Sequence, residues 1–234
     1  MPLLLIEKPT QKSRIFEIVE SKPVPTAGAV ILALAPKRSY STDFDLTENP
    51  MSEGGAWVAN GSLWTPLSTA SGLCVGNQDN SGGYDDSNAC LRGFAPNHQA
   101  SCVIRKNAPS GLNMEVAVTL RWTITSTLTT GYECNIHHNG NYASITRWNG
   151  GLGSFDEITH ITNVTTPQDG DVLSATIIGT NIVSYLNGVV LATADLVAFG
   201  GTIFTTGNPG LDLFRNQGGA SNTFCVTSFT AVDL

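Results

Sequence analysis

Apolar and polar residues alternate in short runs along most of the chain, as they do in β-strands. Two apolar runs, Val172–Ile178 and Ile182–Leu186, are separated by a Gly-Thr-Asn turn, and a third run, Val189–Leu191, follows Asn187-Gly188. Asn-Gly readily adopts positive φ at both central positions of a type I′ turn. We therefore predict a three-stranded antiparallel meander between Asp171 and Leu191.

The middle of the chain contains the longest alternating pattern. Over residues 113–124 it predicts one strand whose apolar face comprises Met114, Val116, Val118, Leu120, Trp122 and Ile124, with Glu115, Ala117, Thr119, Arg121 and Thr123 on the other face. Residues 132–137 repeat the alternation and place Glu133, Asn135 and His137 on a polar face. An Asn-Gly-Asn turn then leads into a further predicted strand, Tyr142–Trp148.

Short strands spaced by Gly- and Asn-rich turns continue to the end of the chain, and we find no convincing helical pattern. Strands at this spacing are typical of sandwiches and jelly rolls. We predict an all-β fold, an antiparallel β-sandwich of the jelly-roll type over residues 39–234. Residues 1–38 form a separate N-terminal extended arm.

The arm differs from the body in charge. It holds six Lys or Arg and three Glu, a net charge of +3, whereas the remainder holds six basic and sixteen acidic residues, a net charge of −10. Pro23 and Pro25 exclude a continuous helix and favour an extended segment. The arm is expected either to add strands to its own domain or to anchor the chain to other protein subunits of an assembly.

Composition narrows the function classes. Only 13% of the residues are charged and the net charge is −7, so nucleic acid is not an expected partner, because nucleic-acid binding needs a cationic face. Neither a membrane-spanning run nor a signal peptide is recognisable, so no membrane association is expected. The Ser-, Thr-, Asn- and Gly-rich composition is common in extracellular and virion β proteins, and we expect a location at the virion or extracellular surface.

The five cysteines lack zinc-site spacing. Because their number is odd, at least one thiol is free, and without a signal peptide we expect buried, reduced cysteines. If a disulfide forms, the pair to look for first is Cys74–Cys90. The five are Cys74, Cys90, Cys102, Cys134 and Cys225.

Four segments, taken in order, resemble the concanavalin A-like (laminin G, lectin and glucanase) jelly-roll superfamily. They are Thr42-Asp43-Phe44-Asp45 followed by Trp57, similar to an opening "DDF…W"; Phe94–Ala100, similar to "F-x-P-D-Q" with a departure at Asn97-His98; Tyr185-Leu186-Asn187-Gly188 with Asp195, similar to "YLNG…D"; and Gly207–Leu211, similar to "G-x-x-G-L". The resemblance covers residues 40–234. It implies a fold shared by lectins, carbohydrate-binding modules, glycosidases, polysaccharide lyases and phage structural proteins.

Catalytic patterns of that superfamily are weak in this chain. The glucanases carry two carboxylates on one strand in an E-x-D-x-x-E pattern, and neither Glu115, Glu133 nor Glu157 begins such a pattern. Asn135-Ile136-His137 loosely resembles the Q-I-H of alginate lyases, but their Y-F-K-x-G-x-Y-x-Q strand is absent. No catalytic residue is assigned, and an enzyme is the less favoured reading.

Candidate binding residues remain. An aromatic plane beside amides and an arginine suits a sugar ring, which makes the candidate ligand-binding residues Tyr142, Arg147, Trp148, Asn149 and His137. The resemblance also implies a possible Ca²⁺ site, for which the loop residues Asp79, Asn80, Asp85 and Asp86 offer oxygen ligands. The alternative readings are a solvated loop and a Trp148 that caps the core.

The leading hypothesis is therefore a non-catalytic, lectin-like structural or adhesive protein. We expect a phage-type virion component (a decoration, tail or fibre protein) anchored through residues 1–38, with a glycan as a possible ligand. The alternatives are a free carbohydrate-binding module and, less favoured, a polysaccharide lyase.

Overall fold

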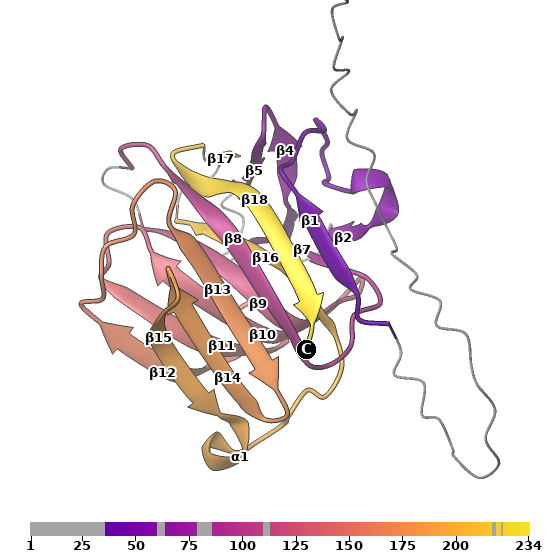
Figure 1. Cartoon of the computed structure of the whole chain (residues 1–234), viewed down its shortest axis with the longest axis vertical. Coiled ribbons are helices and arrows are strands. Elements are labelled where there is room, and N and C mark those ends of the chain that lie inside the picture. Colours follow the sequence, from indigo (N-terminus) through magenta and orange to yellow (C-terminus); the bar gives the residue numbers. More distant parts are fainter. Residues whose placement is uncertain (1–35, 60–63, 79–85, 110–112, 217–218, 221) are drawn as a thin grey trace, which may run out of the picture.

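The computed structural model describes residues 36–59, 64–78, 86–109, 113–216, 219–220 and 222–234. Two antiparallel sheets pack face to face in this part of the chain (Figure 1). The predicted all-β sandwich is therefore confirmed. Residues 1–35 of the arm lie outside the described residues, so its predicted role stays a prediction.

Sheet A contains the predicted meander. Its strands follow the order β15-β14-β13-β8-β18-β5-β4, and β1 pairs with β18 beside this path. Asn187 and Gly188 both have positive φ, 51° and 77°, as the predicted turn between β14 and β15 requires. The strands of sheet A are β1 (Ser39–Thr42), β4 (Ser68–Ala70), β5 (Leu73–Val75), β8 (His98–Lys106), β13 (Val172–Ile178), β14 (Asn181–Leu186), β15 (Val189–Asp195) and β18 (Phe224–Asp233).

Sheet B carries the long alternating strands from the middle of the chain. Its order is β12-β11-β10-β9-β16-β7-β2, with β3 parallel to β7 beside this path. A two-stranded pair, β6 (Asn77–Gln78) with β17 (Gly219–Ala220), lies outside both sheets. The strands of sheet B are β2 (Trp57–Ala59), β3 (Thr65–Pro66), β7 (Ser87–Leu91), β9 (Met114–Ile124), β10 (Thr129–His137), β11 (Tyr142–Gly150), β12 (Phe155–Thr162) and β16 (Asn208–Arg215).

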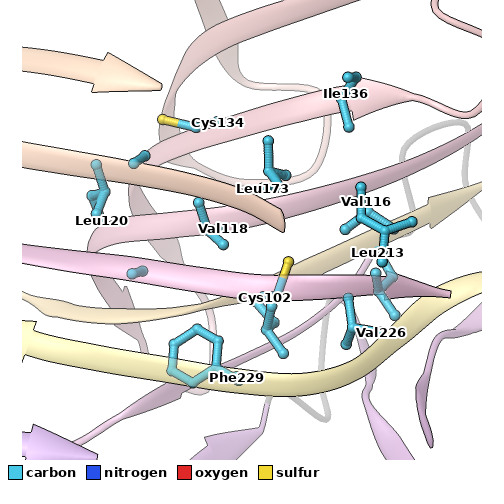
Figure 2. Close-up of a cluster of buried hydrophobic side chains, with 14 of the residues drawn as sticks. Cys102, Val116, Val118, Leu120, Cys134, Ile136, Leu173, Leu213, Val226 and Phe229 are labelled. Atoms are coloured by element: carbon cyan, nitrogen blue, oxygen red, sulfur yellow. The ribbon is translucent and has the colours of Figure 1, made fainter. Parts of the chain in front are cut away.

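The core fills the space between the two sheets. Figure 2 shows side chains of both sheets meeting there, with Val116 and Val118 of β9 near Cys102 of β8 and Phe229 of β18 nearby. Each of these side chains is almost completely buried. Because the apolar residues of β9 and β10 face this core, their alternate residues must lie on the outer face of sheet B, the face turned away from sheet A.

A bulge at Arg121 changes which face the end of β9 presents. Arg121 has a φ of 46°, and the register shifts beside it against both β10 and β16. Two glycines make room for it, since a Cβ on Gly131 would lie 2.7 Å, and one on Gly207 2.1 Å, from the Arg121 carbonyl oxygen. The bulge moves Trp122 out of the core that contains Leu120, so the predicted common face of β9 is wrong from Arg121 onward.

The start of the described body is tied to its last strand. The Arg38 amide donates to Asp233 Oδ2 at 2.9 Å, and the Asp233 amide donates to the Arg38 carbonyl at 2.8 Å. The Arg38 guanidinium also donates to the Arg92 carbonyl at 2.6 Å. Arg38, assigned to the arm from the sequence, is therefore held by the sandwich.

All five cysteines are buried and free. Cys74 and Cys90 do not pair, because Cys74 packs in the core between the sheets and Cys90 in a separate cluster on sheet B. Burial raises the pKa of the Cys90 thiol to about 12. The described residues also include a short α-helix that the sequence pattern did not predict, α1 (Leu196–Phe199), capped by Asp195, and a 3₁₀ turn at Glu53–Gly55. In the described part of the chain, no helix has the length and apolar character needed to cross a bilayer.

Candidate functional site

A cavity of about 360 Å³ opens on the outer face of sheet B. Its walls come mainly from β9, β10, β11 and β12, with one side closed by β16 and the start of β7. It is lined by Asp86, Glu115, Glu133, Asn135, Tyr142, Ser144, Thr146, Trp148, Phe155, Glu157, His160 and Phe214. Carboxyl groups and aromatic rings thus make up most of its wall.

Strand pairing sorts this face into rows across the sheet. Facing residues in one row are Asn88, Asp212, Ala117, Asn135, Ser144 and His160. The next row holds Gly210, Thr119, Glu133, Thr146 and Glu157. The β9 and β16 part of these rows carries the small residues Ala117, Thr119 and Gly210, none of which lines the cavity. The cavity lies over the β10, β11 and β12 part of the rows, where the small residues Ser144 and Thr146 line it between longer side chains.

A shared amide joins two carboxyl groups in the cavity. Asn135 Nδ2 donates to Glu115 Oε2 at 2.7 Å and to Glu133 Oε1 at 3.2 Å. Its Oδ1 accepts from the backbone and the hydroxyl of Ser144, both at 3.0 Å, which fixes the amide with its NH₂ toward the carboxyls. The two carboxyl oxygens can therefore be no farther apart than the sum of 2.7 and 3.2 Å.

Each member of this pair has a second donor of its own. Trp148 Nε1 donates to Glu133 Oε2 at 2.6 Å, and the Tyr142 hydroxyl donates to Glu115 Oε1. Burial and then the neighbouring Glu133 charge raise the pKa of Glu115 to about 8. Burial also raises the pKa of Glu133, while the hydrogen bonds from Trp148 and Asn135 oppose that rise. Both groups can therefore hold a proton at pH values where carboxyls are normally ionised.

Two further carboxyls lie at the β7 side of the face. Asp86 lines the cavity and is 5% exposed, and Asp212 is 1% exposed. Burial raises the pKa of both well above the usual range, with the charges of the other cavity carboxyls adding to it. Asn88 Nδ2 approaches Asp212 Oδ2 at 3.4 Å, while Asn88 Oδ1 is completely buried without a hydrogen-bond partner.

Aromatic rings form the remaining wall. Trp148 packs on Trp64 with ring centroids 4.4 Å apart and on Phe155 at 4.9 Å. Trp148 is only 4% exposed, so it both supports a cluster with Trp64 and Trp122 and faces the cavity. Tyr142 stacks on His160, with ring centroids 5.2 Å apart.

The structure brings together only some of the predicted binding residues. Tyr142 and Trp148 line the cavity, and His137 lies beside Tyr142, 5.0 Å between ring centroids, without lining it. Arg147 does not join them. Its guanidinium binds Asp156 Oδ2 at 2.7 Å and the carbonyls of Gly200 and Thr202, away from the cavity.

The other predicted residues are also dispersed. Asn149 donates to Asp156 outside the cavity at 2.8 Å. For the predicted Ca²⁺ site, Asp79, Asn80 and Asp85 lie outside the described residues, and Asp86 lines the cavity instead. No group of three or more His, Cys, Asp or Glu suited to a metal ion occurs in the described ranges.

The sequence did not identify Glu115 and Glu133 as a pair, because the search was for two carboxylates on one strand. The signal was present as the polar alternation of Glu133, Asn135 and His137 beside that of Glu115, Ala117 and Thr119. Knowledge of the β9–β10 register, which sets Glu133 opposite Thr119 and His137 opposite Glu115, would have brought the two together.

Several solved structures have a fold similar to that of this chain. The carbohydrate-binding module CBM66 from Bacillus subtilis superposes with a TM-score of 0.52 at 13% identity, over 80% of this chain and 96% of the module. The CBM2 module of the evolved Dit of Lactobacillus casei BL23 phage J-1 gives 0.51 at 10% identity, over 85% and 97%. An endo-β-1,3-glucanase from Pyrococcus furiosus gives 0.51 at 14% identity, over 84% and 94%.

The fold is a concanavalin A-like jelly roll. The predicted resemblance to that superfamily is thus confirmed at the level of the fold. No family model matches the sequence, and a search of curated proteins found no match. At these identities the likeness establishes architecture alone, so function has to be argued from the cavity.

Proposed function

We propose that this chain is a lectin-like, non-catalytic glycan-binding protein whose sugar site is the cavity on the outer face of sheet B. The observation that carries the proposal is the pairing of aromatic rings with fixed hydrogen-bonding groups in one hollow. A sugar ring offers an apolar face for stacking and hydroxyls for hydrogen bonding, and Tyr142, Trp148 and Asn135 supply both kinds of contact. The carbohydrate-binding modules among the structural neighbours support this reading.

A glycan array followed by titration of the best ligand tests the site. Tyr142→Ala should weaken binding at least tenfold, because it removes a stacking ring from the wall. Tyr185→Ala, a half-buried tyrosine on sheet A, is the matched control and should leave affinity unchanged. Absence of binding across the array, or equal loss in both variants, would contradict the assignment. Trp148→Ala is a poorer test, because this buried ring also supports Trp64.

We further propose that the domain serves as an adhesive component of a virion, anchored through its N-terminal arm. The opposite charges of arm and body support this, as does the likeness of the fold to a module of a phage Dit protein. Deleting residues 1–35 should abolish assembly with partner subunits while the sandwich still melts cooperatively. Residues 36–38 should be retained, since Arg38 bonds to Asp233. Unchanged assembly after deletion would rule out anchoring by the arm.

A second candidate function is glycoside hydrolysis, favoured by the Glu115–Glu133 pair. Retaining glycosidases hold their two carboxyls about 5–5.5 Å apart, and the shared Asn135 amide permits that separation. In this case Glu133, which accepts from Trp148, would be the nucleophile, and Glu115 the proton donor. Reducing-sugar release from the array's best ligand, abolished in Glu115→Gln, would favour hydrolysis over simple binding.

The polysaccharide lyase alternative finds less support. A lyase must neutralise the uronate carboxylate of its substrate, and Arg121 on β9 is a candidate for that cation. The Arg121 guanidinium instead donates to the carbonyls of Pro96, Phe204 and Gly179, which lie in loops outside the cavity lining. A uronate in the cavity would meet carboxyl groups in place of a cation.

A further inference from the structure

The charge of the cavity wall points to the class of its ligand. Four of the twelve lining residues carry carboxyl groups, Asp86, Glu115, Glu133 and Glu157, and none is Lys or Arg. The one other group in the wall that can become cationic is His160, whose Nδ1 lies 2.7 Å from Glu157 Oε1. The wall is therefore rich in carboxyl groups and lacks a permanent positive charge.

Among the described residues, the side chains that donate hydrogen bonds to Glu115 and Glu133 are neutral. Asn135, Trp148 and Tyr142 donate to Glu115 and Glu133, but a dipole stabilises a buried carboxylate less than a cation does. The raised pKa values of Glu115, Glu133, Asp86 and Asp212 are consistent with the lack of a cation beside them. A cationic ligand would supply one.

Two buried polar side chains on the same face of sheet B lack hydrogen-bond partners. Asn88 Oδ1 and Thr119 Oγ1 are both completely buried and have no hydrogen-bond partner. Asn88 lies in the row of Asp212 and Asn135, and Thr119 in the row of Glu133. Buried polar atoms without partners are rare, and here they share a face with the carboxyls. Neither residue lines the cavity, so both mark the polar character of this face and not a contact for the ligand.

The aromatic part of the wall restricts what kind of cation fits. Tyr142, Trp148, Phe155 and Phe214 surround the carboxyls. Their rings suit the apolar face of a pyranose and attract a nearby ammonium group through the ring quadrupole. A compact hydrated metal ion would leave these rings unused, whereas an amino sugar uses both the rings and the acids.

We propose that the cavity selects glycans that carry free amino groups, such as glucosamine units, over neutral, N-acetylated or uronate glycans. The inference rests on the proposed glycan-binding function of this cavity. The ammonium group would lie between Glu115 and Glu133, which approach each other through Asn135. The sugar ring would pack on Tyr142 and Trp148.

The test is calorimetric titration of the full chain at pH 7 with matched oligosaccharides. The probes are glucosamine tetramer, N-acetylglucosamine tetramer and a glucuronate tetramer, with spermine as a cation that lacks a sugar ring. We expect the glucosamine tetramer to bind at least tenfold more tightly than its N-acetylated counterpart, and no binding of the glucuronate. Equal or tighter binding of the N-acetylated sugar, the uronate or spermine would overturn the inference.

Variants locate the effect in the cavity. Glu133→Gln should reduce the preference for the amino sugar at least tenfold while binding of the N-acetylated sugar persists. Glu157→Gln, at the exposed side of the wall, should reduce it less and serves if Glu133→Gln does not fold. Asp45→Asn removes the same charge from an exposed position away from sheet B, and the preference should remain. A preference lost equally in Asp45→Asn would show attraction to overall charge and refute the site.

The outcomes separate this inference from the function on which it rests. If neutral glycans bind and Tyr142→Ala abolishes that binding, the glycan site stands and only its preference for amines fails. If no glycan on the array binds, the glycan site itself fails.

Discussion

Strands β9, β10 and β11 carry buried arginines and buried glutamates, and the two kinds of side chain have different hydrogen-bond partners. Arg121 and Arg147 are each held by backbone carbonyls of other segments, and Arg147 also by Asp156. Glu115 and Glu133, on the outer face of the same strands, receive hydrogen bonds from neutral groups. The arginines therefore fasten the sandwich, whereas the carboxyls are held at a cost to stability that suits a binding site.

The partners of the two arginines show why they are structural. Arg121 reaches the loop before β8, the β13–β14 turn and the segment before β16, which are far apart in sequence. Arg147 binds the segment after α1. Both close the end of the sandwich where sheets A and B are joined by loops, and neither offers its charge to a ligand.

The largest effect should follow removal of the first arginine. Arg121 is 3% exposed, and Arg121→Met would leave the carbonyls of Pro96, Phe204 and Gly179 without their charged donor. Hydrogen bonds to charged groups contribute roughly 1.5–3 kcal/mol each. We expect a loss of at least about 3 kcal/mol in the free energy of unfolding, measured by urea denaturation. The control is Arg105→Met. Arg105 of β8 forms a partially exposed ion pair with Asp169, so its loss should cost under about 1 kcal/mol. Similar losses in both would contradict the structural role of Arg121.

The carboxyl side should respond in the opposite direction. The folded-state pKa of Glu115 is raised to about 8 from an ordinary value of 4.5, so its contribution to stability is complete below pH 4.5 and is lost as the pH rises toward 8. Glu115→Gln removes that loss. We expect the variant to be more stable than the parent at pH 8, by about 1–2 kcal/mol, and to lose this advantage at pH 4.5.

Urea midpoints of both proteins at pH 4.5, 6 and 8 measure this difference. The buried His98, whose pKa burial lowers to about 4, destabilises both proteins equally as the pH falls from 6.5, so it cancels in the comparison. Glu157→Gln on β12 is the matched control and should show no comparable gain. A Glu115→Gln effect that is the same at every pH would mean that Glu115 is not held against its ionisation.

Local pattern was sufficient for most of the fold. Alternation predicted β9, β10 and β11, and Asn187-Gly188 predicted the β14–β15 turn, because both signals depend on neighbouring residues. The bulge at Arg121 was missed because it depends on Gly131 of β10 and on Gly207, the residue before β16, and these two strands flank β9. Because the bulge was not predicted, Trp122 was placed on the same apolar face as Leu120.

The site was harder to predict for the same reason. Tyr142 and Trp148 were recognised as aromatic residues on one strand, and because they are an even number of residues apart they share a face in any regular strand. Arg147 immediately precedes Trp148, and adjacent residues of a strand point to opposite faces. Its side chain therefore points to the face of β11 opposite the cavity, where it binds Asp156. The carboxyl pair required the register between β9 and β10, which no property of either strand alone provides.

The smallest effect should come from the counter-charge of the second arginine. Asp156→Asn removes the negative charge beside Arg147 but leaves the carbonyls of Gly200 and Thr202 in place. The Asp156 side chain is 41% exposed, so solvent already screens much of the pair. We expect a loss under about 1 kcal/mol in the free energy of unfolding, shrinking further in 1 M NaCl. A loss above about 2 kcal/mol would mean that Arg147 depends on its counter-charge and not on the backbone carbonyls. The contrast between the arginines and the cavity carboxyls would then no longer hold.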